Sequence, residues 1–171
     1  QLHGVMKSAF GKSGDTGITP DEETTHFGMW CMLSSPLVLG NDVRIIPGRT
    51  LKLVTNPFLL RVNQDPLGLQ AYVAARDGEA YVLVKDAEER FGRSRYVALY
   101  NGGDKEHEFT VRASDLDFAS DCAIDAFDLV EMADVGCFTK EVSVKVPPHG
   151  SKFYRVDAAR RVMRTLYEAE T

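Results

Sequence analysis

The pattern of apolar and polar positions divides the chain near residue 68. Before this point, apolar residues recur at helical spacing in two stretches, and one short apolar run lies between them. After it, short apolar runs alternate with turn residues, as in a chain of β-strands. The pattern therefore predicts an α/β segment followed by an all-β segment.

A strong helix start lies at Thr19-Pro20-Asp21-Glu22. Thr19 fits the N-cap, Pro20 fits the first helical position, and Glu22 completes a capping box. The apolar residues that follow share one broad face of this helix: Phe27, Trp30, Cys31 and Leu33. We expect the helix to end at residues 34–35, because Pro36 disfavours helical geometry in the residue before it.

Residues 37–39 are apolar, and Gly40 follows them, which is typical of a strand buried on both sides of a parallel sheet. A second helical pattern covers residues 49–64, and Pro57 is expected to break it into two short helices. Helix, buried strand and helix form the repeating unit of a (β/α)8 barrel or a doubly wound sheet. Residues 1–68 are therefore interpreted as the end of a larger α/β domain.

Residues 69–156 predict a small antiparallel β-sandwich of seven short strands. Asp77-Gly78 is a strong hairpin turn signal, and the alternation of valine with polar residues in 141–146 predicts one buried and one exposed face. The expected strands lie in LQAYVAARDGEAYVLVK (two strands), RYVALYN, HEFTVRA, CAIDAFDLV, EVSVKV and SKFYRV. Residues 157–171 are interpreted as a linker or as the start of a further module.

Composition narrows the function. Hydrophobic content of 44% with 26% charged residues is ordinary for a globular protein. The net charge of −5, without a basic run, argues against nucleic acid as a partner. No apolar run approaches the ~18 residues of a membrane span, so no membrane partner is expected. The first residues form no signal peptide and lack an initiator methionine, and we expect the chain to begin inside a longer protein.

No metal or cofactor is expected. The chain has no Cys/His cluster and no phosphate-cradling glycine loop. The three cysteines are interpreted as buried free thiols, although Cys122 and Cys137 could pair in an oxidising compartment. Five aspartates are scattered at a spacing that does not fit an EF-hand calcium loop, and a solvated surface is the favoured interpretation. They are Asp115, Asp117, Asp121, Asp125 and Asp128.

Three stretches carry a resemblance to a known family: THFGMWCMLSSPLVLGNDVR, VNQDPLGLQA and VPPHGSKFYRV. Together they resemble the end of the catalytic barrel and the C-terminal β-domain of glycoside hydrolase family 27, the α-galactosidase and α-N-acetylgalactosaminidase family. The resemblance covers roughly residues 19–156. It implies the remnant of a (β/α)8 barrel followed by an antiparallel β-sandwich.

The resemblance also implies a function. Enzymes of this kind are retaining glycosidases that use two carboxylates. The family carries them after the fourth and sixth barrel strands, which would lie upstream of Gln1, so no catalytic residue is assigned in this chain and it is expected to be inactive alone. The implied parent is a secreted or periplasmic α-galactosidase that releases terminal α-linked galactose. The implied partners of this chain are the α-galactoside substrate and the upstream barrel.

Other functions stay open. The chain could be a non-catalytic carbohydrate-binding or scaffold module, or part of a sister enzyme such as an α-N-acetylgalactosaminidase or a β-L-arabinopyranosidase. Residues 167–170, Tyr-Glu-Ala-Glu, resemble the opening strand of some carbohydrate-binding modules.

A few residues are candidates for a place near the chemistry. Asn41 and Asp42 follow the predicted buried strand, and barrel active sites lie at the C-terminal ends of strands, so both could orient the catalytic centre from behind. The simpler alternative pairs Asp42 with Arg44 as a cap. His26 as a proton shuttle and Trp30 as a sugar-stacking ring are both weighed below structural roles.

The loop at residues 6–17 resembles an insertion at the active-site end of the barrel, where it could shape the substrate entrance. His3 and Lys12 are further candidates for substrate contact, since loops often carry function.

Overall fold

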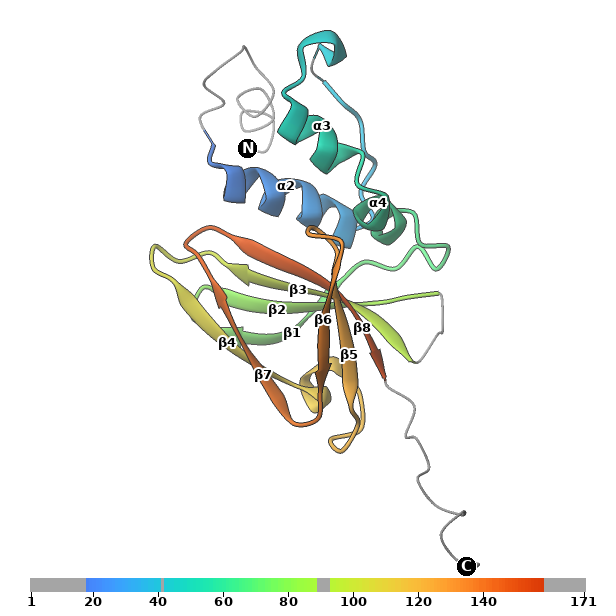
Figure 1. The fold of residues 1–171 in the computed structure, drawn as a ribbon, viewed down its shortest axis with the longest axis vertical. Helices are drawn as coiled ribbons and strands as arrows, with labels where there is room; N and C mark the ends of the chain where they lie inside the picture. Colours follow the sequence, from blue (N-terminus) through green and yellow to red (C-terminus); the bar gives the residue numbers. More distant parts are fainter. Residues whose placement is uncertain (1–17, 41, 89–92, 159–171) are drawn as a thin grey trace, which may run out of the picture.

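The computed structural model describes residues 18–40, 42–88 and 93–158. In this part of the chain, a six-stranded antiparallel sheet lies between a layer of helices and a two-stranded ribbon (Figure 1). The helical elements are α2 (Pro20–Met32), the 3-10 helix η1 (Val43–Ile45), α3 (Gly48–Val54) and α4 (Pro57–Asn63). The expected antiparallel β-sandwich is thus confirmed, with helices packed on its outer face.

The sheet has the strand order β1-β2-β3-β8-β5-β6, and β4 pairs with β7 in the ribbon. The strands are β1 (Tyr72–Asp77), β2 (Ala80–Asp86), β3 (Ser94–Asn101), β4 (His107–Arg112), β5 (Ile124–Asp128), β6 (Ala133–Phe138), β7 (Glu141–Val146) and β8 (Ser151–Ala158). A second 3-10 helix, η2 (Ala113–Leu116), follows β4. The central strand β8 joins the two halves of the sheet, because it pairs with both β3 and β5.

Both faces of the central strands are buried. Along β2, Val82 and Val84 pack into the sandwich core against the ribbon, whereas Leu83 packs toward the helices. On the helix side, Cys31 of α2, Val62 of α4 and Phe153 of β8 form one cluster with Leu83. The helices and the sandwich therefore share a continuous core through the sheet.

The helix predictions are confirmed. The Thr19 backbone N–H donates to Glu22 Oε2 over 2.6 Å, and the Glu22 N–H donates to Thr19 Oγ1 over 3.2 Å. These hydrogen bonds from Thr19 lower the pKa of the Glu22 carboxyl. Pro57 starts a new helix, and the side chain of Asn56 caps it by accepting from the Phe58 and Leu59 N–H groups.

The hairpin predicted at Asp77-Gly78 is also confirmed. Asp77 pairs with Ala80 across a two-residue turn, and Gly78 has a φ of +57°. Glycine adopts this left-handed conformation without the penalty that a Cβ brings.

The strand predicted at residues 37–39 is wrong for this structure. Residues 35–40 form no helix or strand, and the side chains of Val38 and Leu39 are 74% and 46% exposed. A strand needs neighbours to satisfy its backbone groups, and the described part of the chain offers this segment none. The expected barrel remnant is accordingly not seen as a barrel: its helices are present, but its strand is not.

One strand escaped the sequence pattern. The segment of β6 lacks the alternation that marks a half-buried strand, and most of it is exposed at the edge of the sheet. Gly136 interrupts it with a φ of +119°. The described residues therefore contain eight strands, where seven were expected.

Lys85 fastens the helix layer to the sheet. Its residue is fully buried on β2, and its Nζ donates to the carbonyl oxygen of Val62 and to Ser34 Oγ, each over 2.6 Å. Burial lowers the pKa of the Lys85 ammonium, and the nearby Asp65 carboxylate acts in the opposite direction. Asp65 is itself buried and accepts hydrogen bonds from the backbone N–H groups of Leu67 and Glu88.

α2 and the sheet approach closely at Gly28. The ring of Phe153 fills the space that a Cβ of Gly28 would occupy. We predict that Gly28→Ala lowers the free energy of unfolding by about 1–3 kcal/mol, because the added methyl group forces the buried ring and the helix apart. Denaturant unfolding measures the change. Gly48→Ala is the matched control, since nothing lies within 4 Å of its added Cβ, and an equal loss in both variants would contradict the close-approach argument.

A second prediction concerns Lys85. Replacement by alanine leaves a cavity and removes the donor for two buried acceptors, so we expect Lys85→Ala to lower the free energy of unfolding by about 3 kcal/mol. Lys85→Met keeps most of the packing of the stem and should lose less. Lys145→Ala is the control, because that side chain is 64% exposed in a surface ion pair with Glu106. A Lys85→Ala variant as stable as the control would show that the buried ammonium does not hold the layers together.

Candidate functional site

The first candidates lie after residue 40. Asn41 lies outside the described residues. Asp42 forms an ion pair with Arg44: Arg44 Nε donates to Oδ1 over 2.9 Å, and Nη2 donates to Oδ2 over 2.6 Å. The hydrogen bonds from Arg44 lower the pKa of the Asp42 carboxyl. Asp42 also accepts from the Arg44 N–H and so caps η1 rather than a strand end. The predicted pairing of Asp42 with Arg44 is thus confirmed.

His26 and Trp30 lie one turn apart on α2, and their rings meet edge to face at a centroid distance of 6.0 Å. Burial lowers the pKa of His26, and its Nε2 has no hydrogen-bond partner within residues 18–40, 42–88 and 93–158. Trp30 is only partly buried. The other two candidates, His3 and Lys12, lie outside the described residues, as does the loop at 6–17.

The scattered aspartates are not all solvated. Asp128 is buried and accepts hydrogen bonds from the N–H groups of Val130 and Glu131, so it fixes the turn after β5. Asp117 accepts a short hydrogen bond from the Tyr72 hydroxyl, and Asp115 accepts from the Arg112 N–H. The prediction of a solvated surface is therefore wrong for Asp128, because a carboxylate can cap a buried turn.

All three cysteines are free thiols, as expected, but only Cys31 is buried. Burial raises its pKa to about 12, so this thiol stays protonated. Cys137 is exposed on β6, and its pKa is raised by a hydrogen bond with Asp125. The prediction of burial fails at Cys137 because β6 is an edge strand.

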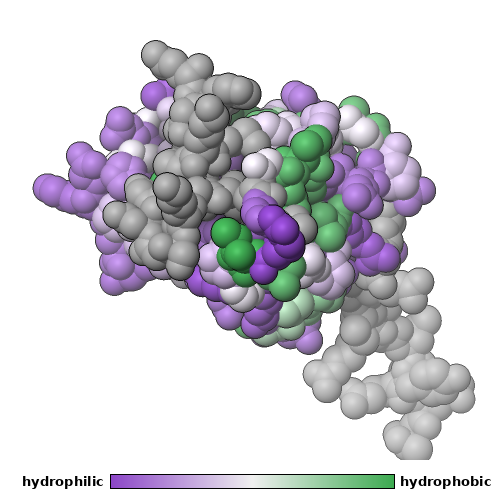
Figure 2. Space-filling model, turned by 90° about the horizontal axis from the view of Figure 1, so that it is seen from above, coloured by the Kyte–Doolittle hydropathy of each residue, from purple (hydrophilic) through white to green (hydrophobic). Residues whose placement is uncertain are grey.

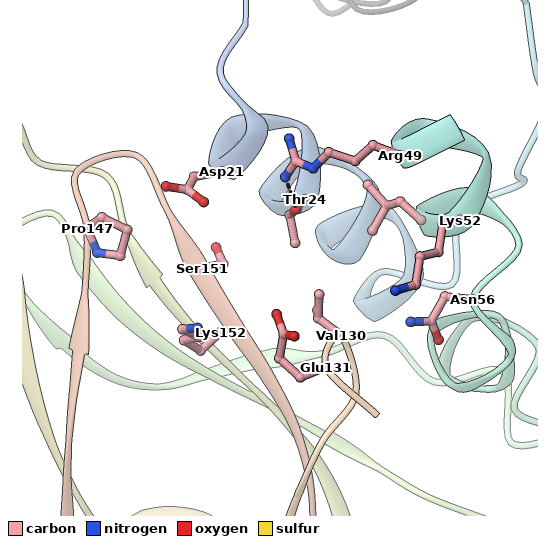
Figure 3. A pocket seen from close by; sticks show the side chains of 11 residues that line it. Asp21, Thr24, Arg49, Lys52, Asn56, Val130, Glu131, Pro147, Ser151 and Lys152 are labelled. Carbon is pink, nitrogen blue, oxygen red and sulfur yellow. Dashed lines mark hydrogen bonds between the residues drawn. The ribbon is translucent and has the colours of Figure 1, made fainter. Parts of the chain in front are cut away.

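The most developed hollow in the described part of the chain is a polar cavity of about 280 Å³ between the helices and the sheet (Figure 3). Four separate segments contribute its charged and hydroxyl-bearing side chains: Asp21 of α2, Arg49 and Lys52 of α3, Glu131 of the β5–β6 turn, and Ser151 and Lys152 of β8. Figure 3 shows Lys52 reaching in from the helix side and Glu131 from the sandwich side.

The frame of this cavity is held by hydrogen bonds. Arg49 Nη2 donates to the carbonyl oxygen of Pro20 over 2.7 Å, which joins α3 to the start of α2. Asn56 is buried, and its Nδ2 donates to the carbonyl oxygen of Leu129 over 2.9 Å, which joins the helix layer to the β5–β6 turn. Thr25 Oγ1 donates to the His149 carbonyl over 3.1 Å at the turn that leads into β8.

The cavity contains polar groups that have no partner. The hydroxyl of Ser151 is buried and makes no hydrogen bond within the described chain. No ion pair joins Lys52 or Lys152 to Asp21 or Glu131 among the described residues. Sequence reasoning missed this site, because its residues come from four distant segments and carry no motif.

The described residues contain no group of three or more His, Cys, Asp or Glu side chains that could hold a metal ion. None of their helices is both long and apolar enough to cross a membrane. The chemistry available in this part of the chain is therefore hydrogen bonding and charge, not metal coordination.

The sandwich and its helices have known counterparts. Residues 77–156 match the alpha galactosidase C-terminal beta sandwich domain. Alpha-galactosidase 2 of Arabidopsis thaliana is 30% identical over 141 residues, which are 82% of this chain and 35% of that protein. These matches define the class: a C-terminal β-sandwich domain of the α-galactosidase type, joined here to the helices that precede it.

Two solved structures extend the match beyond the sandwich. The crystal structure of alpha-galactosidase I from Mortierella vinacea matches 84% of this chain and 37% of that chain, with a TM-score of 0.76 and 26% identity. A family 27 β-L-arabinopyranosidase from Geobacillus stearothermophilus matches 92% of this chain and 35% of that chain, with a TM-score of 0.76 and 28% identity. The chain belongs to glycoside hydrolase family 27 and corresponds to the C-terminal part of its members. It spans 35% and 36% of the length of two curated relatives.

Proposed function

We propose that this chain is the C-terminal part of a retaining α-galactosidase that releases terminal α-linked galactose. The two catalytic carboxylates would lie upstream of Gln1, in the part of the barrel that this chain does not contain. One would attack the sugar to form a covalent glycosyl intermediate, and the other would act as the acid and then the base. Family membership and the α-galactosidase relatives support this proposal.

The observation that carries the proposal is an apolar surface on the helix side of the molecule. Val38 and Ile45 are 74% and 64% exposed, and Leu39 and Leu51 are about half exposed. Figure 2 shows apolar residues gathered on this end of the molecule, between polar ones. Exposed apolar patches of this kind mark a surface that another element covers. The missing barrel strands and helices are the occupant that the family relationship suggests.

In this proposal the chain contributes the frame and not the reaction. The helices would cover one side of the barrel, and the sandwich would buttress them through Lys85 and Asn56. The segment around Asp42 would then become the eighth barrel strand and its C-terminal end, where barrel enzymes place their active sites. The parent protein is proposed to be secreted or periplasmic.

A second specificity has direct support. The family 27 β-L-arabinopyranosidase from Geobacillus stearothermophilus matches this chain as well as the α-galactosidase from Mortierella vinacea does. β-L-Arabinopyranose and α-D-galactopyranose differ by the exocyclic CH₂OH group, so the substrate contacts that discriminate them would lie in the upstream loops. A non-catalytic sugar-binding module is the remaining alternative.

The proposal is tested by hydrolysis of a chromogenic α-galactoside. We expect no activity from residues 1–171 alone and clear activity from the same segment extended upstream through a complete barrel. A chromogenic β-L-arabinopyranoside and an α-N-acetylgalactosaminide, assayed in parallel, identify a sister specificity. Hydrolysis by the 171-residue chain itself would refute the placement of the carboxylates, and no hydrolysis of any of the three by the extended protein would leave the non-catalytic module.

A further prediction concerns Asp42 in the extended protein. If Asp42 orients the catalytic centre from behind, Asp42→Asn should lower kcat roughly tenfold with KM unchanged, because a small misplacement of reacting groups is costly. Arg44→Gln breaks the same ion pair without altering the carboxylate, and it should leave kcat near the wild-type value. Equal kinetic effects of both substitutions, or none, would reduce Asp42 to a partner of Arg44.

A further inference from the structure

We propose that the cavity between α2, α3 and β8 binds one neutral sugar unit. The choice of a galactose unit as its ligand rests on the function proposed above. The binding site itself is inferred from the cavity's size, its charge balance and its unpartnered polar groups. Each of these features is considered in turn.

The size of the cavity favours a single ring. Its volume of about 280 Å³ lies at the lower end of the roughly 300–1,000 Å³ typical of small-molecule sites. Leu53, Val130 and Pro147 add apolar patches to a largely polar wall. This combination suits a sugar ring, which presents C–H groups on one side and hydroxyl groups around its edge.

The charges in the wall favour a neutral ligand with hydroxyl groups. The three cations, Arg49, Lys52 and Lys152, nearly balance the carboxylates of Asp21 and Glu131. An anion would be repelled by the carboxylates and a cation by the ammonium groups. A sugar hydroxyl donates one hydrogen bond and accepts others, so neighbouring hydroxyls can serve a carboxylate and an ammonium group together.

The cavity is also prepared for such a ligand. Arg49 and Asn56 are fixed by hydrogen bonds to the backbone of other segments, so the walls keep their spacing. The buried Ser151 hydroxyl, which has no partner within the described chain, is an unsatisfied group that faces this space. A buried polar group without a partner is costly, and a ligand hydroxyl would relieve that cost.

Galactose titrated into the isotope-labelled 171-residue chain tests the site by two-dimensional NMR. We expect amide shifts at residues that line the cavity, among them Lys52, Glu131 and Ser151. Glu131→Gln removes the charge at nearly constant shape and should weaken binding about tenfold, as expected for a lost hydrogen bond to a charged group. Glu141→Gln is the matched control, because Glu141 lies on β7 in a surface ion pair with Arg112. It should bind galactose as the wild-type chain does.

Two further measurements keep the test decisive. Ser151→Ala should also weaken binding, and unchanged thermal unfolding of each variant shows that the fold is intact. Inorganic phosphate is the comparison ligand: equal shifts with phosphate would identify an anion site and overturn the proposal. Shifts confined to other surfaces, or Glu131→Gln binding like Glu141→Gln, would overturn it as well.

The outcome is independent of the hydrolysis assay. Galactose binding in this cavity, combined with an inactive extended protein, would support the site and refute the enzyme. Hydrolysis by the extended protein without galactose binding here would support the enzyme and refute the site.

Discussion

The buried ammonium group of Lys85 is the interaction on which the arrangement of the layers depends. A charge can be buried only when it is paired and hydrogen-bonded. Lys85 meets this requirement with the Val62 carbonyl at the end of α4, the Ser34 hydroxyl after α2, and Asp65 nearby. Since these partners belong to three segments of the helix layer, the helices cannot leave the sheet without stranding a charge. One side chain on β2 therefore sets how the helices sit on the sandwich.

That attachment gives the helix layer two different faces. The inner face is packed closely enough that only glycine fits at position 28 against Phe153. The outer face and the segment that joins α2 to α3 leave Val38, Leu39 and Ile45 exposed. Amphipathic helices on a sheet usually turn polar residues outward. The apolar outer surface is therefore best understood as the half of an interface whose other half is the proposed upstream barrel.

Much of this fold could be predicted from local signals. The capping box at Thr19, the break at Pro57 and the Asp77-Gly78 hairpin depend on neighbouring residues, and each was confirmed. The predictions failed where distant partners decide the outcome. The segment at residues 37–39 has the composition of a buried strand but no strand beside it here, and β6 pairs with β5 without an alternating pattern of its own. The family resemblance supplied the function that local patterns could not.

The candidate site follows the same rule more strictly. Of the residues proposed from the sequence, Asp42 could be assigned a partner because Arg44 lies two positions away. The cavity could not be predicted, because its walls meet only after α2, α3, β8 and the β5–β6 turn have assembled. Asn56 illustrates the link, since one side chain caps α4 and also binds the carbonyl of Leu129 beside the cavity. The contacts that join the helices to the sandwich thus also create the cavity. Any ligand that touches both walls would bind the assembled state alone and would stabilise the junction itself.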